Sequence, residues 1–122
     1  MSLKLIDQLL EYFFHHQIVL KMYHFQTKSY GAHKASDAYL ATLLANFDKF
    51  FEVAQGIYGK VDMNEINVRI QCANDDNIVQ HLEKFISTLK GLDGKIKDTS
   101  LINLRDEMVA DAQQLKYLLT FK

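Results

Sequence analysis

The sequence predicts an all-α fold, a bundle of four helices. Three observations support this. Apolar residues recur every three or four positions in four separate stretches. The chain has no proline, a residue that breaks helix interiors. Glycines and short polar clusters separate the stretches. A chain of 122 residues has the size of one domain, so we predict a single domain over residues 1–122.

The first two helices are predicted at about residues 2–29 and 33–56. Ser2 is a potential N-cap of the first helix, and Gly31 marks the turn between the two. The apolar stripe of the first helix contains Leu3, Ile6, Leu9, Leu10, Phe13, Leu20 and Tyr23. That of the second contains Tyr39, Leu40, Leu43, Leu44, Phe47, Phe50, Phe51, Ala54 and Ile57. Gly56 and Gly59 lie where the second helix should end.

Residues 60–75 show a different pattern, because apolar and polar residues alternate between Ile66 and Cys72. A period of two indicates extended chain or a short strand. Helical spacing returns at about residues 76–92 and again at about 100–119. Asp98, Thr99 and Ser100 are capping candidates for the last helix.

The lengths of the connections predict the topology. The connections between the first two helices and between the last two are short, which favours antiparallel neighbours. The middle connection has about 16 residues and can span roughly 50 Å, whereas a helix of about 24 residues is only about 36 Å long. We therefore expect it to run the length of the bundle, a single long crossover as in ferritin-like bundles. The alternative is an up-and-down bundle with a loose loop.

Charge and cysteine content exclude several classes of function. The net charge is −1 and no basic tract is present, which argues against a nucleic-acid partner. No apolar run approaches the roughly 20 residues of a membrane span, so we expect no membrane partner. A single cysteine, Cys72, and the absence of a signal peptide favour a reducing, cytoplasmic location.

One face of the second helix lies outside its apolar stripe and is made of small and acidic residues. At 100° per residue these lie about 80–160° from Phe47. They are Asp37, Ala41, Ala45, Asp48, Glu52 and Gln55. The two alanines and the absence of lysine favour contact with another helix, most simply in a homodimer or larger homo-oligomer. The alternative is a solvated face.

Asp48 and Glu52 are four residues apart, so their like charges lie one above the other and a bound cation would relieve their repulsion. His24 and His33 flank the first turn. Two histidines and two carboxylates suit iron, manganese or zinc. The alternatives are a hydrogen-bonded core histidine at position 24 and two solvated carboxylates. His81 is expected at the surface.

These residues carry a resemblance to a known family. The segment His24-Phe25-Gln26, followed by His33 and by Asp48-x-x-x-Glu52, resembles the ferroxidase motif of the Dps-type miniferritins. Both the spacing of fifteen from His33 to Asp48 and that of four to Glu52 match the family pattern. The stretches 23–30 and 55–60 are also similar to those of viral and phage proteins thought to be ferritin-like.

The resemblance implies a protein that binds iron and oxidises it with dioxygen or peroxide. It implies that His24 and His33 are nitrogen ligands, and that Asp48 and Glu52 supply oxygen from across a two-fold interface. Along one chain His33 and Asp48 are about 22 Å apart, so a site with all four residues needs a second copy. The alternative function is a homodimer that acts as a non-catalytic binding or scaffold module.

Overall fold

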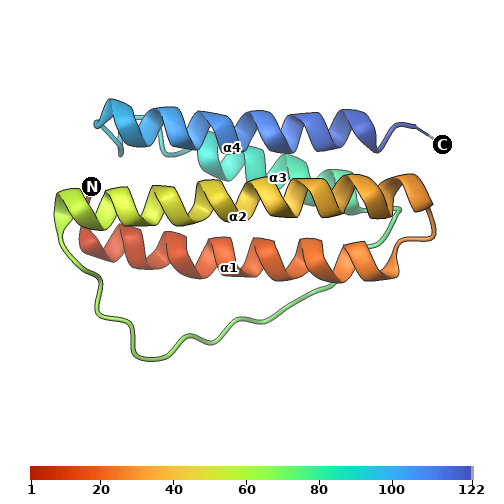
Figure 1. The fold of residues 1–122 in the computed structure, drawn as a ribbon. Coiled ribbons are helices and arrows are strands. Elements are labelled where there is room, and N and C mark those ends of the chain that lie inside the picture. Colours follow the sequence, from red (N-terminus) through yellow and green to blue (C-terminus); the bar gives the residue numbers. More distant parts are fainter. Residues whose placement is uncertain (122) are drawn as a thin grey trace.

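The computed structural model describes residues 1–121 and contains four helices. They are α1 (Leu3–Gln26), α2 (Tyr30–Tyr58), α3 (Ile78–Lys90) and α4 (Thr99–Leu118). No described residue belongs to a β-strand. The prediction of an all-α fold with four helices is therefore confirmed. The helices lie side by side with their axes roughly aligned (Figure 1).

The two short connections produce antiparallel neighbours. The chain runs along α1, turns through residues 27–29 and returns along α2 (Figure 1). It makes a second reversal between α3 and α4. Helix α2 packs against both α1 and α4, and α3 packs mainly against α4.

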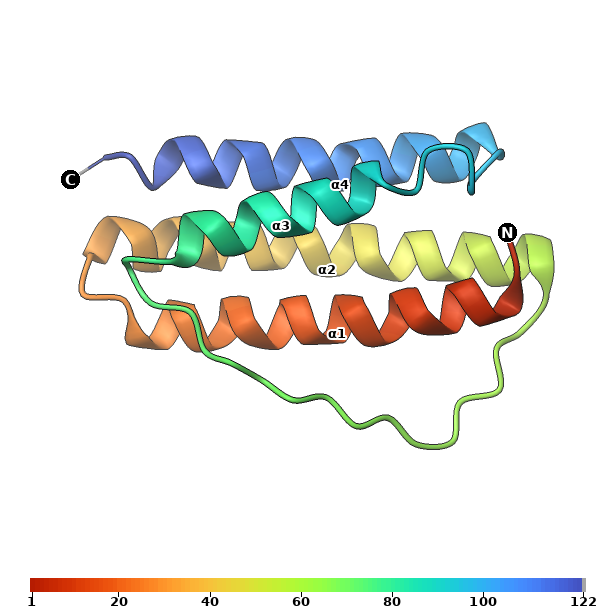
Figure 2. The ribbon, with the colours of Figure 1, turned by 180° about the vertical axis from the view of Figure 1, so that it is seen from behind.

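The middle connection, residues 59–77, runs outside the bundle along α1 (Figures 1 and 2). Near its start, the Val61 amide donates to the Gln55 side chain in the last turn of α2. Near its end, Asp75 accepts hydrogen bonds from the side chain of Thr27 and the amide of Lys28. It therefore joins opposite ends of the α1–α2 pair, and α3 runs in the same direction as α2. The possible strand in residues 60–75 is absent from the described chain.

The starts of α1 and α2 follow from side-chain capping. Ser2 accepts a hydrogen bond from the Leu5 amide, as its position predicts. Ser29 accepts one from the Ala32 amide, so α2 begins at Tyr30. Gly31 thus lies within the first turn of α2. The expectation that Gly31 marks the turn, with the helix starting near His33, was wrong. The Ser29 side chain accepts from the Ala32 amide, so the helix already begins before Gly31.

The core is centred on aromatic rings from three helices. Phe13 of α1 is 1 % exposed, and its ring centroid lies 5.3 Å from that of Phe51, 5.5 Å from that of Phe47 and 5.8 Å from that of Phe85. Such tilted and edge-on pairs add to the stabilisation that burial provides. This packing fixes α1 against α2 and α3, and with them the side chains considered below.

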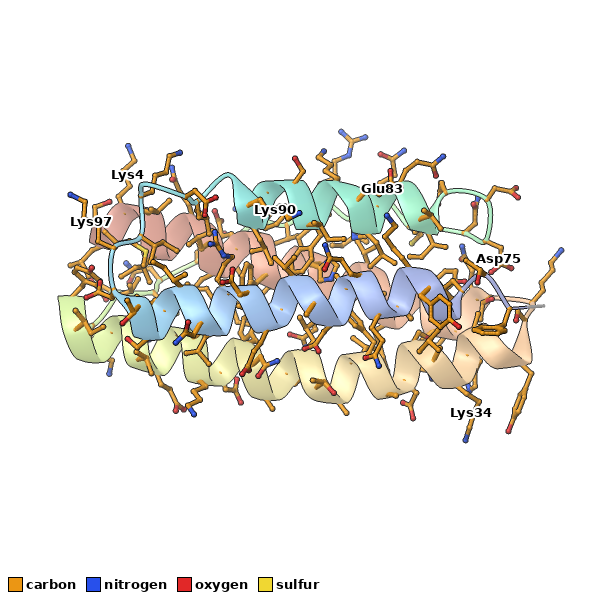
Figure 3. All side chains as sticks on the ribbon, turned by 90° about the horizontal axis from the view of Figure 1, so that it is seen from above. Lys4, Lys34, Asp75, Glu83, Lys90 and Lys97 are labelled. Carbon is orange, nitrogen blue, oxygen red and sulfur yellow. The ribbon has the colours of Figure 1, made fainter. Side chains whose placement is uncertain are left out.

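Charged side chains project from the outer surface, whereas Arg105 is buried. Lys4, Lys34 and Lys97 project away from the bundle in the view of Figure 3. Asp75 lies at the end of the bundle formed by the turn between α1 and α2 (Figure 3). Between residues 1 and 121, no helix has both the length and the apolar character needed to cross a membrane.

Candidate functional site

His24 and His33 are brought together by the turn between α1 and α2. Their rings stack with centroids 3.9 Å apart and planes inclined by 17°. Nδ1 of His24 lies 2.9 Å from the carbonyl oxygen of His33, and Nδ1 of His33 lies 2.8 Å from the carbonyl oxygen of His24. Each ring thus holds the backbone of the other residue, an arrangement that we call the histidine clasp.

The clasp determines which nitrogen of each ring carries the hydrogen. A carbonyl oxygen can only accept, so Nδ1 donates in both residues. Among the described residues neither Nε2 has a hydrogen-bond partner. Every buried side-chain nitrogen in residues 1–121 has a hydrogen-bond partner. Nε2 of His24 has none, so this atom reaches the surface although His24 as a whole is only 7 % exposed. In a neutral ring, each Nε2 then keeps a free lone pair.

The surroundings of the clasp hold its geometry in place. Ser36, which is fully buried, donates its hydroxyl hydrogen to the carbonyl oxygen of His33 and lies 3.1 Å from Nδ1 of His24. A histidine that ligates a metal usually donates its other ring N–H to a carbonyl or carboxylate, which fixes the orientation of the ring. The clasp provides this arrangement twice, in two histidines whose rings stack.

Asp48 and Glu52 lie on the exposed face of α2, about four to five turns from His33. Ala41 and Ala45 are exposed on the same face. Across residues 1–121, no group of three or more histidine, cysteine, aspartate or glutamate side chains is placed to hold a metal ion. One chain therefore brings the two histidines together and leaves the two carboxylates at a distance, as the spacing along α2 requires.

The face that carries the carboxylates continues onto α1 with exposed apolar side chains. Phe14 of α1 contacts Phe47 of α2, with ring centroids 5.2 Å apart, so this side of α1 adjoins the strip of α2. Helical spacing places Ile18 and Phe25 within about 40° of Phe14. Both are exposed, Phe25 by 68 %. Leu44 of α2, next to the carboxylate strip, is also exposed.

A second group of polar side chains crosses the core. His16 of α1 is 1 % exposed, and its Nε2 lies 2.7 Å from the hydroxyl of Tyr39 on α2. Its Nδ1 lies 3.1 Å from Nε2 of His81 on α3. The His16 ring also stacks on Phe85, with 3.5 Å between centroids. We call these three hydrogen-bonded residues the buried chain.

Burial controls the protonation of the buried chain. Loss of solvent lowers the pKa of His16 well below its ordinary value of 6.5, with smaller contributions from His81 and His15. Loss of solvent, assisted by the charges of His15 and Lys84, lowers the pKa of His81 to about 4. Burial raises the pKa of Tyr39. At neutral pH both imidazoles and the phenol are therefore uncharged.

The buried chain was not predicted from the sequence. The expectation that His81 is a surface residue was wrong, because His81 is partly buried and bonded to His16. The available signal was weak: His16 lies at helical spacing from Phe13 and Leu20, within the apolar stripe of α1. The partners of His16 come from two other helices, and the sequence of α1 alone does not reveal them.

The comparisons with known proteins give one result. The model of a protein family described as "Family of unknown function (DUF5856)" matches residues 24–119, well over half of the chain. The matched range includes the histidine clasp, both carboxylates and two of the three residues of the buried chain. No curated protein matches significantly, and neither does any solved structure.

Proposed function

The chain belongs to the DUF5856 family of unknown function, and we propose that it is a Dps-like protein that binds iron between two copies of itself. In this proposal His24 and His33 of one copy supply nitrogen ligands. Asp48 and Glu52 of the second copy supply oxygen ligands. Manganese and zinc suit the same donors. Bound ferrous ion is the substrate, to be oxidised by dioxygen or peroxide.

The observation that carries the proposal is the histidine clasp. Both Nδ1 atoms donate to carbonyl oxygens, which leaves both Nε2 lone pairs available at one end of the bundle. A core histidine with only a structural role needs no second histidine that donates back to its own carbonyl oxygen. Two imidazoles fixed in the tautomer that ligates through Nε2 are the part of a metal site that one chain can prepare alone.

The carboxylates favour a site shared between copies. Asp48 and Glu52 lie side by side on an exposed face, and no cation within 4 Å pairs with either in the described chain. Burying such a pair in an interface costs several kcal/mol unless positive charge offsets it. A metal ion held together with the clasp of a second copy supplies that charge.

The position of the alanines agrees with a two-fold dimer. In an antiparallel pairing of two α2 helices, His33 of one copy lies opposite the Asp48–Glu52 pair of the other if the crossing is centred at about residue 41. Ala41 is exposed at this position, and its small side chain permits close approach of the two helices. Exposed Ile18, Phe25 and Leu44 supply apolar area beside the crossing.

The ferritin-like arrangement forms part of the same proposal. A long connection that follows α1, with α2 and α3 running in the same direction, is the feature that separates a ferritin-like bundle from an up-and-down bundle. The anchoring of residues 59–77 at Gln55 and Asp75 supports this interpretation.

The proposal is tested by anaerobic calorimetric titration with ferrous or zinc ion. We expect the parent to bind and the double variant Asp48→Ala, Glu52→Ala to lose binding while it keeps its helical circular dichroism. The matched control is Asp62→Ala, Glu65→Ala, which removes two exposed carboxylates from the long connection and should bind like the parent. Equal binding by all three proteins, or no binding by the parent, would favour the alternative, a homodimer that acts as a non-catalytic binding or scaffold module.

A further inference from the structure

A cavity of about 440 Å³ lies between α1, α3 and the last part of the long connection, away from the proposed metal site. Arg69 and Lys84 contribute cationic side chains to its wall, and His15 and His81 contribute imidazoles. Asn77 and Gln80 add amides, and no acidic residue lines it. Within residues 1–121, neither Arg69 nor Lys84 forms an ion pair. The cavity thus combines uncompensated positive charge with several hydrogen-bond donors.

The buried chain determines what His81 offers to this cavity. The phenolic hydrogen of Tyr39 finds its only protein acceptor in the described chain at Nε2 of His16. A neutral His16 then carries its hydrogen on Nδ1 and donates to Nε2 of His81. A neutral His81 must carry its own hydrogen on Nδ1. With each residue donating to the next, from Tyr39 through His16 to His81, both contacts are hydrogen bonds and the phenolic hydrogen of Tyr39 has an acceptor.

Nδ1 of His81 is accessible from the cavity. This nitrogen has no hydrogen-bond partner among residues 1–121. In the same residues, every side-chain nitrogen that is buried has a partner, so Nδ1 of His81 is not buried. The atom therefore reaches solvent, and His81 lines the cavity. The core of the bundle holds His81 in the tautomer that presents an N–H donor to whatever occupies the cavity.

We propose that this cavity binds a phosphate group, with Arg69 and Lys84 supplying charge and the Nδ1–H of His81 donating a hydrogen bond. A guanidinium and an ammonium pair strongly with phosphate oxygens, and a neutral N–H adds direction to the contact. Tyr39 and His16 are positioning residues, because they act only through the tautomer of His81. The bound group is either free phosphate or the phosphate of a small organic monoester, since the volume accommodates both.

Calorimetry and NMR test the proposal with two probes, inorganic phosphate and phenyl phosphate. We expect at least one probe to bind the parent, and tighter binding of phenyl phosphate would identify a monoester as the natural class of ligand. The double variant Arg69→Gln, Lys84→Gln should bind at least about tenfold more weakly. The matched control Lys90→Gln removes a lysine of α3 outside the cavity and should leave binding unchanged.

Two further measurements separate the binding site from a purely structural role. Cys72, the single cysteine, is exposed and lines the cavity, so bound phosphate should slow its alkylation by iodoacetamide. Tyr39→Phe removes the hydrogen that orients the buried chain, so the ¹⁵N spectrum should show His81 losing its preference for the Nδ1–H tautomer, with weaker phosphate binding. Binding of neither probe to the parent, or equal binding by the double variant, would overturn the proposal.

Discussion

His24 and His33 each donate the Nδ1 hydrogen to the backbone carbonyl oxygen of the other, at 2.9 and 2.8 Å. The eight residues between them include the whole turn from α1 to α2. The clasp therefore fastens two helix ends and also prepares two Nε2 lone pairs. Its structural and its proposed metal-binding role can be separated by experiment.

His33→Ala removes one hydrogen bond to a backbone carbonyl and the stacked partner of a buried ring. We expect a loss of about 1–2 kcal/mol in the free energy of unfolding. Urea denaturation followed by circular dichroism measures this loss. The control Lys34→Ala changes the next, exposed residue and should shift stability by less than about 0.5 kcal/mol. Parent-like stability of His33→Ala would show that the clasp does not hold the turn.

Arg105 fastens the other end of the bundle. It is 6 % exposed, and it donates to the carbonyl oxygen of Leu89, near the end of α3, and to Asp93 at 2.7 Å. Arg105→Ala removes a charged hydrogen bond to the Leu89 carbonyl oxygen, which keeps only the Leu92 amide as donor, and it removes the packed stem, so we expect a loss of about 2–4 kcal/mol. Arg105→Lys should recover part of this loss. A change below about 0.5 kcal/mol in Arg105→Ala, measured by the same denaturation, would contradict this role.

Acid should destabilise the fold through the buried chain. The pKa of His81 is lowered to about 4 in the folded state from an ordinary value of 6.5, and that of His16 is also lowered. Below pH 6.5 the unfolded chain takes up protons that the folded chain excludes, so stability falls as pH decreases toward about 4. Urea denaturation at pH 7, 6 and 5 measures this slope.

The variant His81→Gln should flatten that slope, because it removes one of the two groups responsible. Asp75 contributes in a lower range. Its pKa is depressed below 3.8 by hydrogen bonds from the Thr27 side chain and the Lys28 amide, so its stabilisation is lost only in stronger acid. An equally steep slope between pH 7 and 5 in His81→Gln would assign the acid sensitivity to other groups.

The sequence was sufficient to predict the helices, because apolar spacing and the absence of proline act locally. It misplaced the start of α2, since spacing alone does not show that the Ser29 hydroxyl accepts from the Ala32 amide and so starts the helix before Gly31. It indicated His24 and His33 through their spacing, but their mutual hydrogen bonds require the closed turn. The buried chain could not be predicted, because His16 and His81 are 65 residues apart and meet only in the packed bundle.

The proposed dimer is tested by a bulky charge placed about one helical turn from the centre of the crossing. Ala45 is exposed on the strip of α2 that should contact the second copy. Ala45→Arg should convert a dimer into a monomer in sedimentation velocity, because the arginine cannot be accommodated where two helices approach closely. The control Lys49→Arg replaces one long cationic side chain by another at an exposed position of the same helix, so this variant should stay dimeric. A monomeric parent, or an unchanged dimer in Ala45→Arg, would contradict the interface.

The proposed metal site draws its ligands from two chains, and a mixed dimer distinguishes such a shared site from one within a single chain. One chain carries His24→Ala with His33→Ala, the other Asp48→Ala with Glu52→Ala, and two affinity tags isolate the heterodimer. Each variant alone should bind no ferrous or zinc ion. The heterodimer combines intact histidines of one chain with intact carboxylates of the other, so it should regain one site, about half the parental stoichiometry. No recovery of metal binding in the heterodimer would contradict a site shared between chains.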